Sequence, residues 1–416
     1  MIPNSYRALL EDRRARRLLS GLGVSSLGDG LSTVTIAWLA VRTAPHGELG
    51  PFVGLALAAY ALPGAVGAIA LGPYLRHRAP RALVLTNCLL RTTFLGTIVV
   101  LAATGALSPV AYVVLLAGSS LLASWGSAGQ YTLLAEVGGE DGRLAANSLS
   151  SAQVWLATIL GPAAAGLLLA RIAPAWLLGF DAASFAFLGL QAWRTCGAAR
   201  PAEQPIDAQA AESGVRLLRR RGLLGLIALT WLFFFLYGPV EAALPVFVAH
   251  DLHAHAGALG AYWTSFGIGA LVSTLLVGTL RRIATRRVTL LIVAGWGACL
   301  VPFAFAPFGV TLVCFAIGGV VYGPFIPITY ALLQSITTPA NLPSVLAVRS
   351  AALIVAAPLG TAIGGPIVGG IGAGWTLTVS GASTVLLAVA ATVAWRRRSD
   401  QTGQESRSGL GEPQLT

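Results

Sequence analysis

The chain has 416 residues, of which 56% are hydrophobic and only 10% are charged, and its formal net charge is +11. A soluble globular domain carries roughly a quarter charged residues, so this composition excludes a soluble protein and leaves lipid as the solvent for most of the surface. The basic residues are all arginine and cluster between long apolar runs, as membrane orientation signals do, which argues against nucleic-acid binding.

Apolar stretches recur along the whole chain, and twelve of them reach the roughly 20 residues that an α-helix needs to cross a bilayer. In chain order they are 18–41, 52–75, 82–104, 109–134, 145–170, 175–196, 222–249, 257–280, 288–306, 309–334, 345–371 and 373–395. The runs are too long for barrel strands and do not alternate polar with apolar residues. The sequence therefore predicts an all-α integral membrane protein with twelve transmembrane helices.

Polar segments divide these helices into two sets of six. We expect an N-terminal arm at 1–17, a first bundle at 18–196, a linker at 197–221, a second bundle at 222–395 and a tail at 396–416. The tail is polar and is predicted to be disordered.

The arginines predict the orientation of the chain. Of the 27, 23 fall on one side of the membrane, in the segments 7–17, 76–81, 143, 194–221, 281–287 and 396–407. The positive-inside rule then places both termini in the cytoplasm of a plasma-membrane protein, as an even number of spans also requires.

The two halves resemble each other at matching places, with offsets of 199 to 206 residues. The pairs are Gly72–Arg81 with Gly278–Arg287, Tyr131 with Tyr330, Leu144–Ser148 with Leu346–Ser350, Gly161-Pro162 with Gly365-Pro366, and Trp176 with Trp375. The shared order favours an internal duplication, which places a substrate site near the midplane between two pseudo-symmetric bundles.

Charged residues inside spans are costly and are usually functional or paired; here they are Asp29, Arg91, Asp181, Glu241 and Arg349. Asp29 lies near the middle of the first span, where it suits proton coupling, although a structural pairing with Arg91 is an equal alternative. Glu241 stands between two prolines in the repeat of that span, and we expect it to accept a proton or to bind a cationic substrate.

For the other two charged residues we expect structural roles. Asp181 is expected to pair with Arg91 or to contact Asn147. Arg349 lies a few residues inside its span, and we expect it to snorkel to the cytoplasmic surface or to brace the gate.

Aromatic and amide side chains in the spans are candidates for lining an amphiphilic cavity, with packing as the alternative for each. They are Trp125, Gln130, Tyr131, Tyr262, Trp263, Tyr322, Tyr330 and Gln334. Gly161-Pro162 and Gly365-Pro366 are expected to allow close helix contacts between the halves and to kink their helices.

The sequence offers no sign of a cofactor or an enzyme. The spacing of His250, His253 and His255 matches no zinc template, and the four cysteines form no CxxC motif. There is no GxxxxGK[ST] motif for direct use of ATP, and no nucleophile–base grouping stands out.

Several stretches together resemble the major facilitator superfamily, and within it the twelve-span exporters of macrolides and enterobactin. They are SSLGDGLSTVTIAWLA at 25–40, the basic loop after Gly72 that ends at Arg81, ANSLSSAQVWLATILGPAAAG at 146–166 and GGPIVGG at 364–370. The resemblance implies alternating access by a monomer, with Gly72 and Arg81 in the gating loop and Arg349 near the gate.

The chain departs from the family pattern in its gating and antiporter motifs. Arg76 stands where the gating loop normally has an acid, and Arg282 is its counterpart. Ala157 and Ala165 replace usual glycines, and the fourth span lacks the arginine of many proton antiporters.

The leading hypothesis is a proton-driven exporter of a small hydrophobic or amphiphilic molecule, such as a drug, an antibiotic or another natural product. Uptake of a nutrient is the second hypothesis, and a membrane sensor or scaffold that no longer transports is the third.

Overall fold

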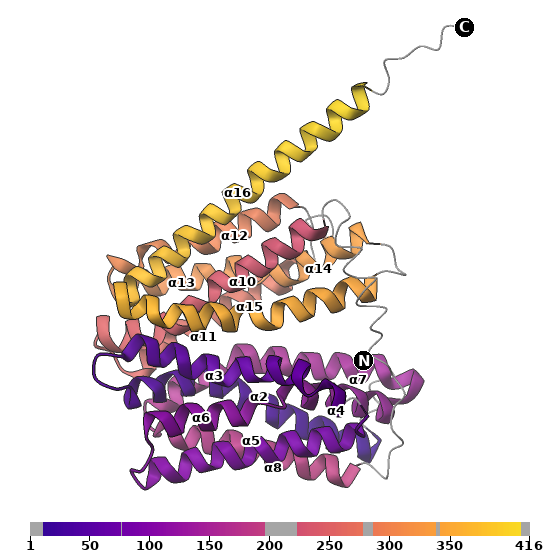
Figure 1. Cartoon of the computed structure of the whole chain (residues 1–416), viewed down its shortest axis with the longest axis vertical. Coiled ribbons are helices and arrows are strands. Elements are labelled where there is room, and N and C mark those ends of the chain that lie inside the picture. The colour runs from indigo at the N-terminus through magenta and orange to yellow at the C-terminus, as the bar shows by residue number, and fades with distance from the viewer. Residues whose placement is uncertain (1–10, 76, 196–222, 278–285, 338–341, 409–416) are drawn as a thin grey trace.

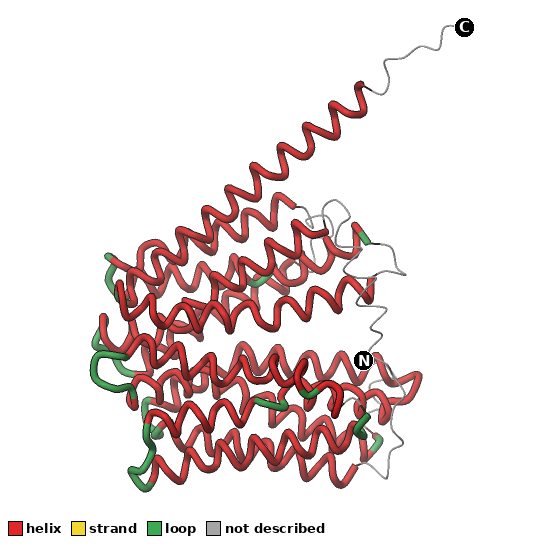
Figure 2. The backbone as a smooth tube through the Cα atoms, in the orientation of Figure 1, coloured by secondary structure: helices red, strands yellow, loops and turns green. Residues whose placement is uncertain are grey.

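The computed structural model describes residues 11–75, 77–195, 223–277, 286–337 and 342–408. Within these ranges every regular element is a helix, and the connections between helices are short (Figure 2). The all-α prediction is confirmed. The predicted linker at 197–221, Arg76 of the gating loop and Arg282 lie outside the described residues.

Within the described ranges, the first half contains seven α-helices, and the second half contains seven α-helices, one short π-helix and one short 3₁₀-helix. The first half has α2 (Arg13–Thr43), α3 (Leu49–Ala70), α4 (Gly72–Leu75), α5 (Pro80–Ala103), α6 (Pro109–Ser120), α7 (Ala123–Leu169) and α8 (Pro174–Thr195). The second half has α10 (Leu223–Val246), the π-helix η1 (Phe247–Asp251), α11 (Ala256–Val277), α12 (Arg286–Leu300), the 3₁₀-helix η2 (Val301–Ala304), α13 (Phe308–Tyr322), α14 (Phe325–Ile336), α15 (Leu342–Ile371) and α16 (Ala373–Ser408).

Among the described residues, 11 helical stretches are long and apolar enough to cross a membrane. Helix α11, which is not among these 11, has 22 residues and packs in the second bundle against α13. Two of the spans are assembled from neighbouring helices: α6 continues into α7 to form Pro109–Leu134, and α13 continues into α14 to form Phe308–Ile336. These two composite spans occupy equivalent places in the repeat.

Two predicted irregular segments are helical instead. The expected break between the fourth and fifth spans is absent, because α7 runs from Ala123 to Leu169 and its first proline is Pro162. Helix α16 continues to Ser408, through much of the segment expected to be a disordered tail. Both are extensions of existing helices, where each further residue adds a hydrogen bond without the cost of nucleation.

The two halves repeat the same helix packing. In the first half α2 packs on α7 and α8, and α5 packs on α8; in the second half α10 packs on α15 and α16, and α12 packs on α16. Figure 1 shows the resulting two bundles, with α2 to α8 in one and α10 to α16 in the other. The pseudo-symmetric arrangement predicted from the repeat is confirmed.

The halves meet where α3 packs on α15 and α7 packs on α11. These contacts lie close to the short turns at 44–48, 170–173, 252–255 and 372, an end of the molecule that we call the turn end. Figure 1 shows the bundles closest together there and further apart toward the opposite end, where the N-terminus lies.

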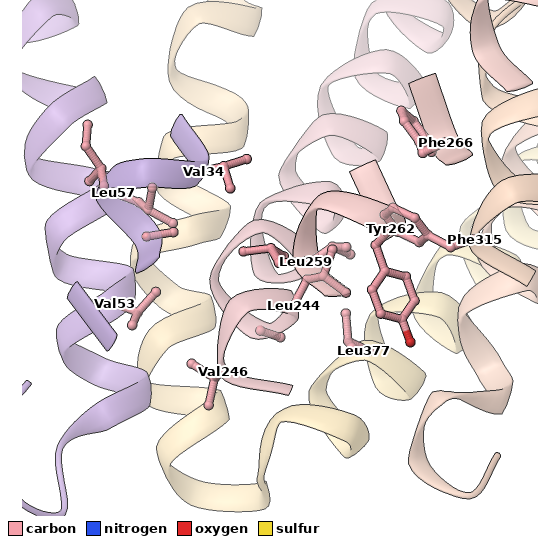
Figure 3. Packing of buried hydrophobic residues seen from close by; sticks show 14 of the residues in the cluster. Val34, Val53, Leu57, Leu244, Val246, Leu259, Tyr262, Phe266, Phe315 and Leu377 are labelled. Atoms are coloured by element: carbon pink, nitrogen blue, oxygen red, sulfur yellow. The ribbon is translucent and has the colours of Figure 1, made fainter. Parts of the chain in front are cut away.

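Glycines bring the helices of the two halves together at the turn end. A Cβ atom on Gly54 of α3 would lie 2.6 Å from the Cα of Gly365 on α15, and one on Gly166 of α7 would collide with the backbone of Gly260 on α11. Without a hydrophobic driving force between lipid-facing helices, such close backbone contact is a main source of association. One apolar cluster, including Val53, Leu57 and Val246, also spans both halves here (Figure 3).

Candidate functional site

The first half contains a cluster of charged and hydroxyl groups at the middle of its helices. Arg91 of α5 donates from Nη1 to Asp29 Oδ1 of α2 at 2.6 Å and to the hydroxyl of Tyr60 of α3 at 2.7 Å. The Tyr60 hydroxyl donates to the same Asp29 oxygen at 3.0 Å. The guanidinium also stacks on the rings of Tyr60 and Phe185. Three helices are thus joined around one ion pair, as the structural alternative for Asp29 and Arg91 anticipated.

Asp181 of α8 lies next to this cluster but has different hydrogen-bond partners. Its side chain is fully buried and accepts from Ser32 of α2 at 2.6 Å and from Ser184 at 3.3 Å. It interacts electrostatically with both Arg91 and Asp29. The expected direct pairing with Arg91 is therefore replaced by two serine hydroxyls, and the Asn147 side chain lies outside the described residues.

The absence of a side chain at Gly28 makes the Asp181 contacts possible. A Cβ atom at this position of α2 would collide with Asp181 Oδ1 and lie 2.5 Å from Ser184 Oγ. The glycine lets α2 approach α8 closely enough for Ser32, one helical turn further along, to reach the carboxylate.

A polar cavity of about 240 Å³ opens beside the cluster and is lined by α2, α5, α7 and α8. The side chain of Asp29 is 46% exposed in this environment, whereas that of Arg91 is 9% exposed. Gln130 and Tyr131, two of the predicted lining residues, lie on its wall with Asn87 and several serines. Trp125 does not line it, because its indole is buried and donates to the carbonyl of Gly67 at 3.0 Å.

Two side-chain atoms of residues that line the cavity are buried and have no hydrogen-bond partner among the described residues. They are Oδ1 of Asn87, whose residue is 2% exposed, and Nε of Arg91. Buried polar groups in native proteins are nearly always satisfied, so orphaned ones at a cavity call for an explanation.

Glu241 of α10 is the corresponding acid in the second half. It is partly buried, and the hydroxyl of Thr361 on α15 lies 3.2 Å from its Oε2 and 2.9 Å from the carbonyl of Ala357, so the Thr361 donor is shared between the two. No cation pairs with it among the described residues. The repeat thus places an acid in both first helices of the halves, but only the N-terminal one is held by an arginine.

The aromatic candidates of the second half form a packed core. Tyr262 is fully buried and exchanges a hydrogen bond with Thr311 at 2.6 Å. Trp263 and Tyr322 are partly buried, and both contact Phe266. The packing alternative therefore fits Tyr262, which Figure 3 shows beside Phe315.

Arg349 of α15 is buried rather than extended to the surface. The residue is 3% exposed, its Nη2 donates to Thr329 at 3.3 Å, and its guanidinium stacks on Tyr330 with 4.2 Å to the ring centre. The expectation of snorkelling is wrong, because Thr329 and Tyr330 of α14 hold the side chain inside the bundle. Gln334, one turn further on, is exposed.

The remaining candidates lie at helix contacts. Gly161 packs on Gly30 of α2, inside its own half, whereas Gly365 packs on Gly54 across the interface between the halves. Only one of the two Gly-Pro motifs therefore lies between the halves; Pro162 and Pro366 both lie within continuous helices. Gly72 begins α4, and Arg81 donates to the carbonyl of Trp193 on α8 at 2.9 Å.

Nothing in the sequence singled out Tyr60, Ser32, Thr361 or Asn87. Hydroxyl and amide residues in spans are common, and most here bond to their own helix, as Thr86 does to Ala82. The sequence feature that comes nearest to predicting them is the intramembrane ion pair itself, because such a pair needs further hydrogen-bond partners. No group of three potential metal ligands occurs among the described residues.

Comparison with known proteins shows which protein family this chain resembles. Residues 226–414 match the model of the Major Facilitator Superfamily. The multidrug efflux pump Tap of Mycolicibacterium fortuitum is 27% identical over 391 residues, covering 89% of this chain and 93% of that protein. The chain is therefore similar to the major facilitator superfamily, by a family model in its second half and by weaker similarity over most of its length. Both similarities are to membrane transport proteins.

Further similarities point to the same superfamily. An uncharacterized MFS-type transporter, y4rN of Sinorhizobium fredii, is 27% identical and covers 88% of this chain and 91% of that protein. The crystal structure of the nucleoside transporter NupG matches with a TM-score of 0.71 and 14% identity, covering 92% of this chain and 99% of that one. A D-xylose–proton symporter matches with a TM-score of 0.65 and 16% identity, covering 90% and 96%. The solved structures show the shared fold alone.

Proposed function

We propose that this protein is a transporter of the major facilitator superfamily and that it exports a small hydrophobic or amphiphilic molecule in exchange for protons. The direction is supported by the similarity to multidrug efflux pumps, which extends over most of both chains. The observation that carries the coupling is the pair of carboxylates in equivalent helices, Asp29 of α2 and Glu241 of α10. Acids inside transporter spans are typical of proton relays.

Alternating access follows from the packing of the halves. They are joined at the turn end through α3, α15, α7 and α11. If the arginine distribution orients the chain as expected, this end faces the outside, and the conformation is closed outward. Transport then requires the glycine contacts at Gly54 and Gly166 to separate while the opposite ends approach each other.

Membrane vesicles of both orientations test the proposal. Everted vesicles that contain the transporter should accumulate fluorescent amphiphiles when their interior is acidified, because the exporter then pumps inward, whereas vesicles from cells without it should not. Accumulation by right-side-out vesicles alone would establish uptake instead. An absence of flux for every compound in both orientations would support the sensor hypothesis.

Variants of the two acids test the coupling. Asp29→Asn and Glu241→Gln should each reduce accumulation driven by the pH gradient at least tenfold. Glu136→Gln provides the control, because Glu136 is an exposed carboxylate between two spans. The coupling assignment is wrong if both variants accumulate the compounds at the rate of the control.

A further inference from the structure

The last spans of the two halves end in the same pair of residues. Trp193-Arg194 in α8 and Trp395-Arg396 in α16 are separated by 202 residues, within the offsets of the internal repeat. In both halves an arginine at the start of the neighbouring helix contacts the tryptophan. Arg81 of α5 donates to the Trp193 carbonyl at 2.9 Å, and the guanidinium of Arg286 of α12 lies over the Trp395 ring, 5.5 Å from its centre. A tryptophan–arginine cluster therefore lies at the same end of each bundle, opposite the turn end.

The two clusters differ in how their arginines are used. Arg81 is partly buried and bound to the end of α8, whereas Arg286, Arg287 and Arg396 are all exposed. None of these three forms an ion pair with an acid whose side chain the structure describes. The guanidinium of Arg286 contacts the Trp395 ring with its face, so the N–H groups in its plane stay available to a ligand. The second half thus carries an uncompensated positive surface, Arg286, Arg287, Trp395 and Arg396, which we call the α12–α16 patch.

The α12–α16 patch lies where two spans leave the membrane. One candidate span, Arg286–Ala304, begins at the patch, and another, Ala373–Arg396, ends there. Helices α12 and α16 pack on each other, and Figure 1 shows both on the side of the second bundle that is remote from α2 to α8. Tryptophan and arginine are typical of the level at which lipid headgroups lie. The patch therefore faces the lipid surface and not the interface between the halves.

Exposed apolar side chains lead up to the arginines on both helices. On α16, Val389 and Val393 are exposed, and Arg396 follows them on the same face of the helix. On α12, the exposed Leu291 lies one turn from Arg287. An apolar surface that ends in several guanidinium groups matches the outline of a phospholipid, with the acyl chains along the helices and the phosphate at the arginines.

We propose that the α12–α16 patch binds the phosphate of an anionic phospholipid, with Arg286, Arg287 and Arg396 as the donors and Trp395 at the level of the headgroup. The negative charge of the headgroup decides the selectivity. Phosphatidylglycerol keeps the charge of its phosphate, whereas the choline cation of phosphatidylcholine compensates it and is repelled by the three arginines. The proposal goes beyond export and is independent of the direction of transport.

Native mass spectrometry of the purified full chain in detergent micelles counts bound lipids directly. The probes are dioleoylphosphatidylglycerol and dioleoylphosphatidylcholine, which share their acyl chains and differ in the charge of the headgroup. The Kd of the first bound phosphatidylglycerol should be at least about tenfold lower than that of phosphatidylcholine, because each arginine near an anionic headgroup contributes about a factor of five. Equal Kd values for the two lipids overturn the proposal.

Paired substitutions locate the effect. Arg286→Gln/Arg396→Gln should weaken phosphatidylglycerol binding at least about tenfold and leave phosphatidylcholine binding unchanged. The control is Arg42→Gln/Arg171→Gln, which removes two exposed arginines at the turn end and changes the net charge equally. Arg286→Lys/Arg396→Lys keeps both charges and should bind phosphatidylglycerol within about threefold of the native chain. The site is rejected if the glutamine pair binds phosphatidylglycerol as the turn-end control does, or if the lysine pair loses tenfold or more.

The internal repeat supplies a second comparison. Arg194→Gln changes the counterpart of Arg396 in the half whose neighbouring arginine, Arg81, is bound to a backbone carbonyl. This variant should change the Kd of phosphatidylglycerol less than twofold, whereas Arg396→Gln should raise it about fivefold. Equal losses in the two single variants would overturn the assignment of the lipid to the second half.

A soluble competitor distinguishes a lipid from a free phosphate ester. Glycerol 3-phosphate carries a phosphate group without acyl chains, so it lacks the contact with the apolar surface below the arginines. At the same concentration as phosphatidylglycerol it should leave the bound lipid in place. Displacement of the lipid at equal concentration would overturn the proposal and assign the patch to a soluble anion.

Discussion

Replacement of Arg91 by methionine isolates the contribution of the buried cation. Methionine keeps much of the apolar stem and removes the guanidinium that donates to Asp29 at 2.6 Å and to Tyr60 at 2.7 Å. The variant leaves Asp29 and Asp181 without a cation, because no other basic side chain among the described residues pairs with either. Burying an acid without its partner is more costly than losing the bond itself.

The expected magnitude follows from the geometry. Breaking a fully buried ion pair by removing one partner costs about 3–5 kcal/mol. The Asp29 side chain is 46% exposed, so water compensates part of the loss on that side, and we expect about 2–4 kcal/mol for Arg91→Met. Asp29→Asn keeps the shape of the side chain and an acceptor for Tyr60, and it should cost about 1 kcal/mol.

A double-mutant cycle measures the coupling directly. The unfolding of purified Arg91→Met, Asp29→Asn and the double variant is followed by circular dichroism as the mole fraction of SDS in mixed micelles is raised. The double variant should be more stable than the sum of the single losses by about 1–2 kcal/mol, because the neutral amide that replaces the Asp29 carboxylate needs no cation. Additive losses within about 0.5 kcal/mol would show that the Asp29–Arg91 pair does not stabilise this fold.

Three other substitutions test the helix contacts. Gly28→Ala places a methyl group against Asp181 Oδ1 and Ser184 Oγ and should cost about 1–3 kcal/mol in the same SDS titration, whereas Gly309→Ala, which meets no atom within 4 Å, should cost far less. Gly54→Leu should reduce vesicle transport more than about tenfold, because the added side chain keeps α3 from closing on α15 and costs well over the ~1.4 kcal/mol that corresponds to a factor of ten. The control is Gly96→Leu, since Gly96 also has no neighbour within 4 Å. Equal transport by the two variants would show that the Gly54 contact is not part of the mechanism. Trp125→Phe loses the bond to the Gly67 carbonyl and should lower stability by about 1 kcal/mol in the same SDS titration; unchanged stability would show that this bond does not help to hold α7 against α3.

The spans and their pairing were predictable because they depend on coarse properties of the chain. A run of apolar residues fixes a crossing, and a repeat fixes which helices are equivalent. The two exceptions, the helical segment inside α7 and the helical extension of α16, are places where polar composition suggested a break but no proline enforces one among the described residues.

Of the residues in the candidate site, only the charged ones could be predicted from the sequence. Asp29 and Arg91 stand out because an ionised group in a span needs a partner, and the pairing of the two was one of the alternatives. The residues that complete the cluster depend on how each helix is rotated about its axis. Ser32 reaches Asp181 only because Gly28 lets α2 approach α8, and no linear pattern encodes that approach.

The two halves use one scaffold for different internal chemistry. In the first half, Arg91, Tyr60 and two serines hold the acids in fixed hydrogen bonds. In the second half the corresponding helices are packed by aromatic rings around Trp296 and Phe315, and Glu241 has a single hydrogen bond, from Thr361. Glu241 is therefore the acid whose surroundings need the least rearrangement when its charge changes.

The position of Thr361 connects that acid to the interface between the halves. Its backbone approaches Gly238 of α10, and its carbonyl would lie 2.9 Å from a Cβ atom on Gly54 of α3. One residue of α15 thus holds the Glu241 carboxylate with its hydroxyl and borders the opposite half with its backbone. We infer that protonation of Glu241, which weakens its need for the Thr361 donor, loosens α15 at the point where the turn end must open. Thr361→Val should then slow pH-driven transport in vesicles about tenfold or more, because a lost neutral-to-charged hydrogen bond is worth about 1.5–3 kcal/mol. Normal transport by Thr361→Val would break this link between the acid and the gate.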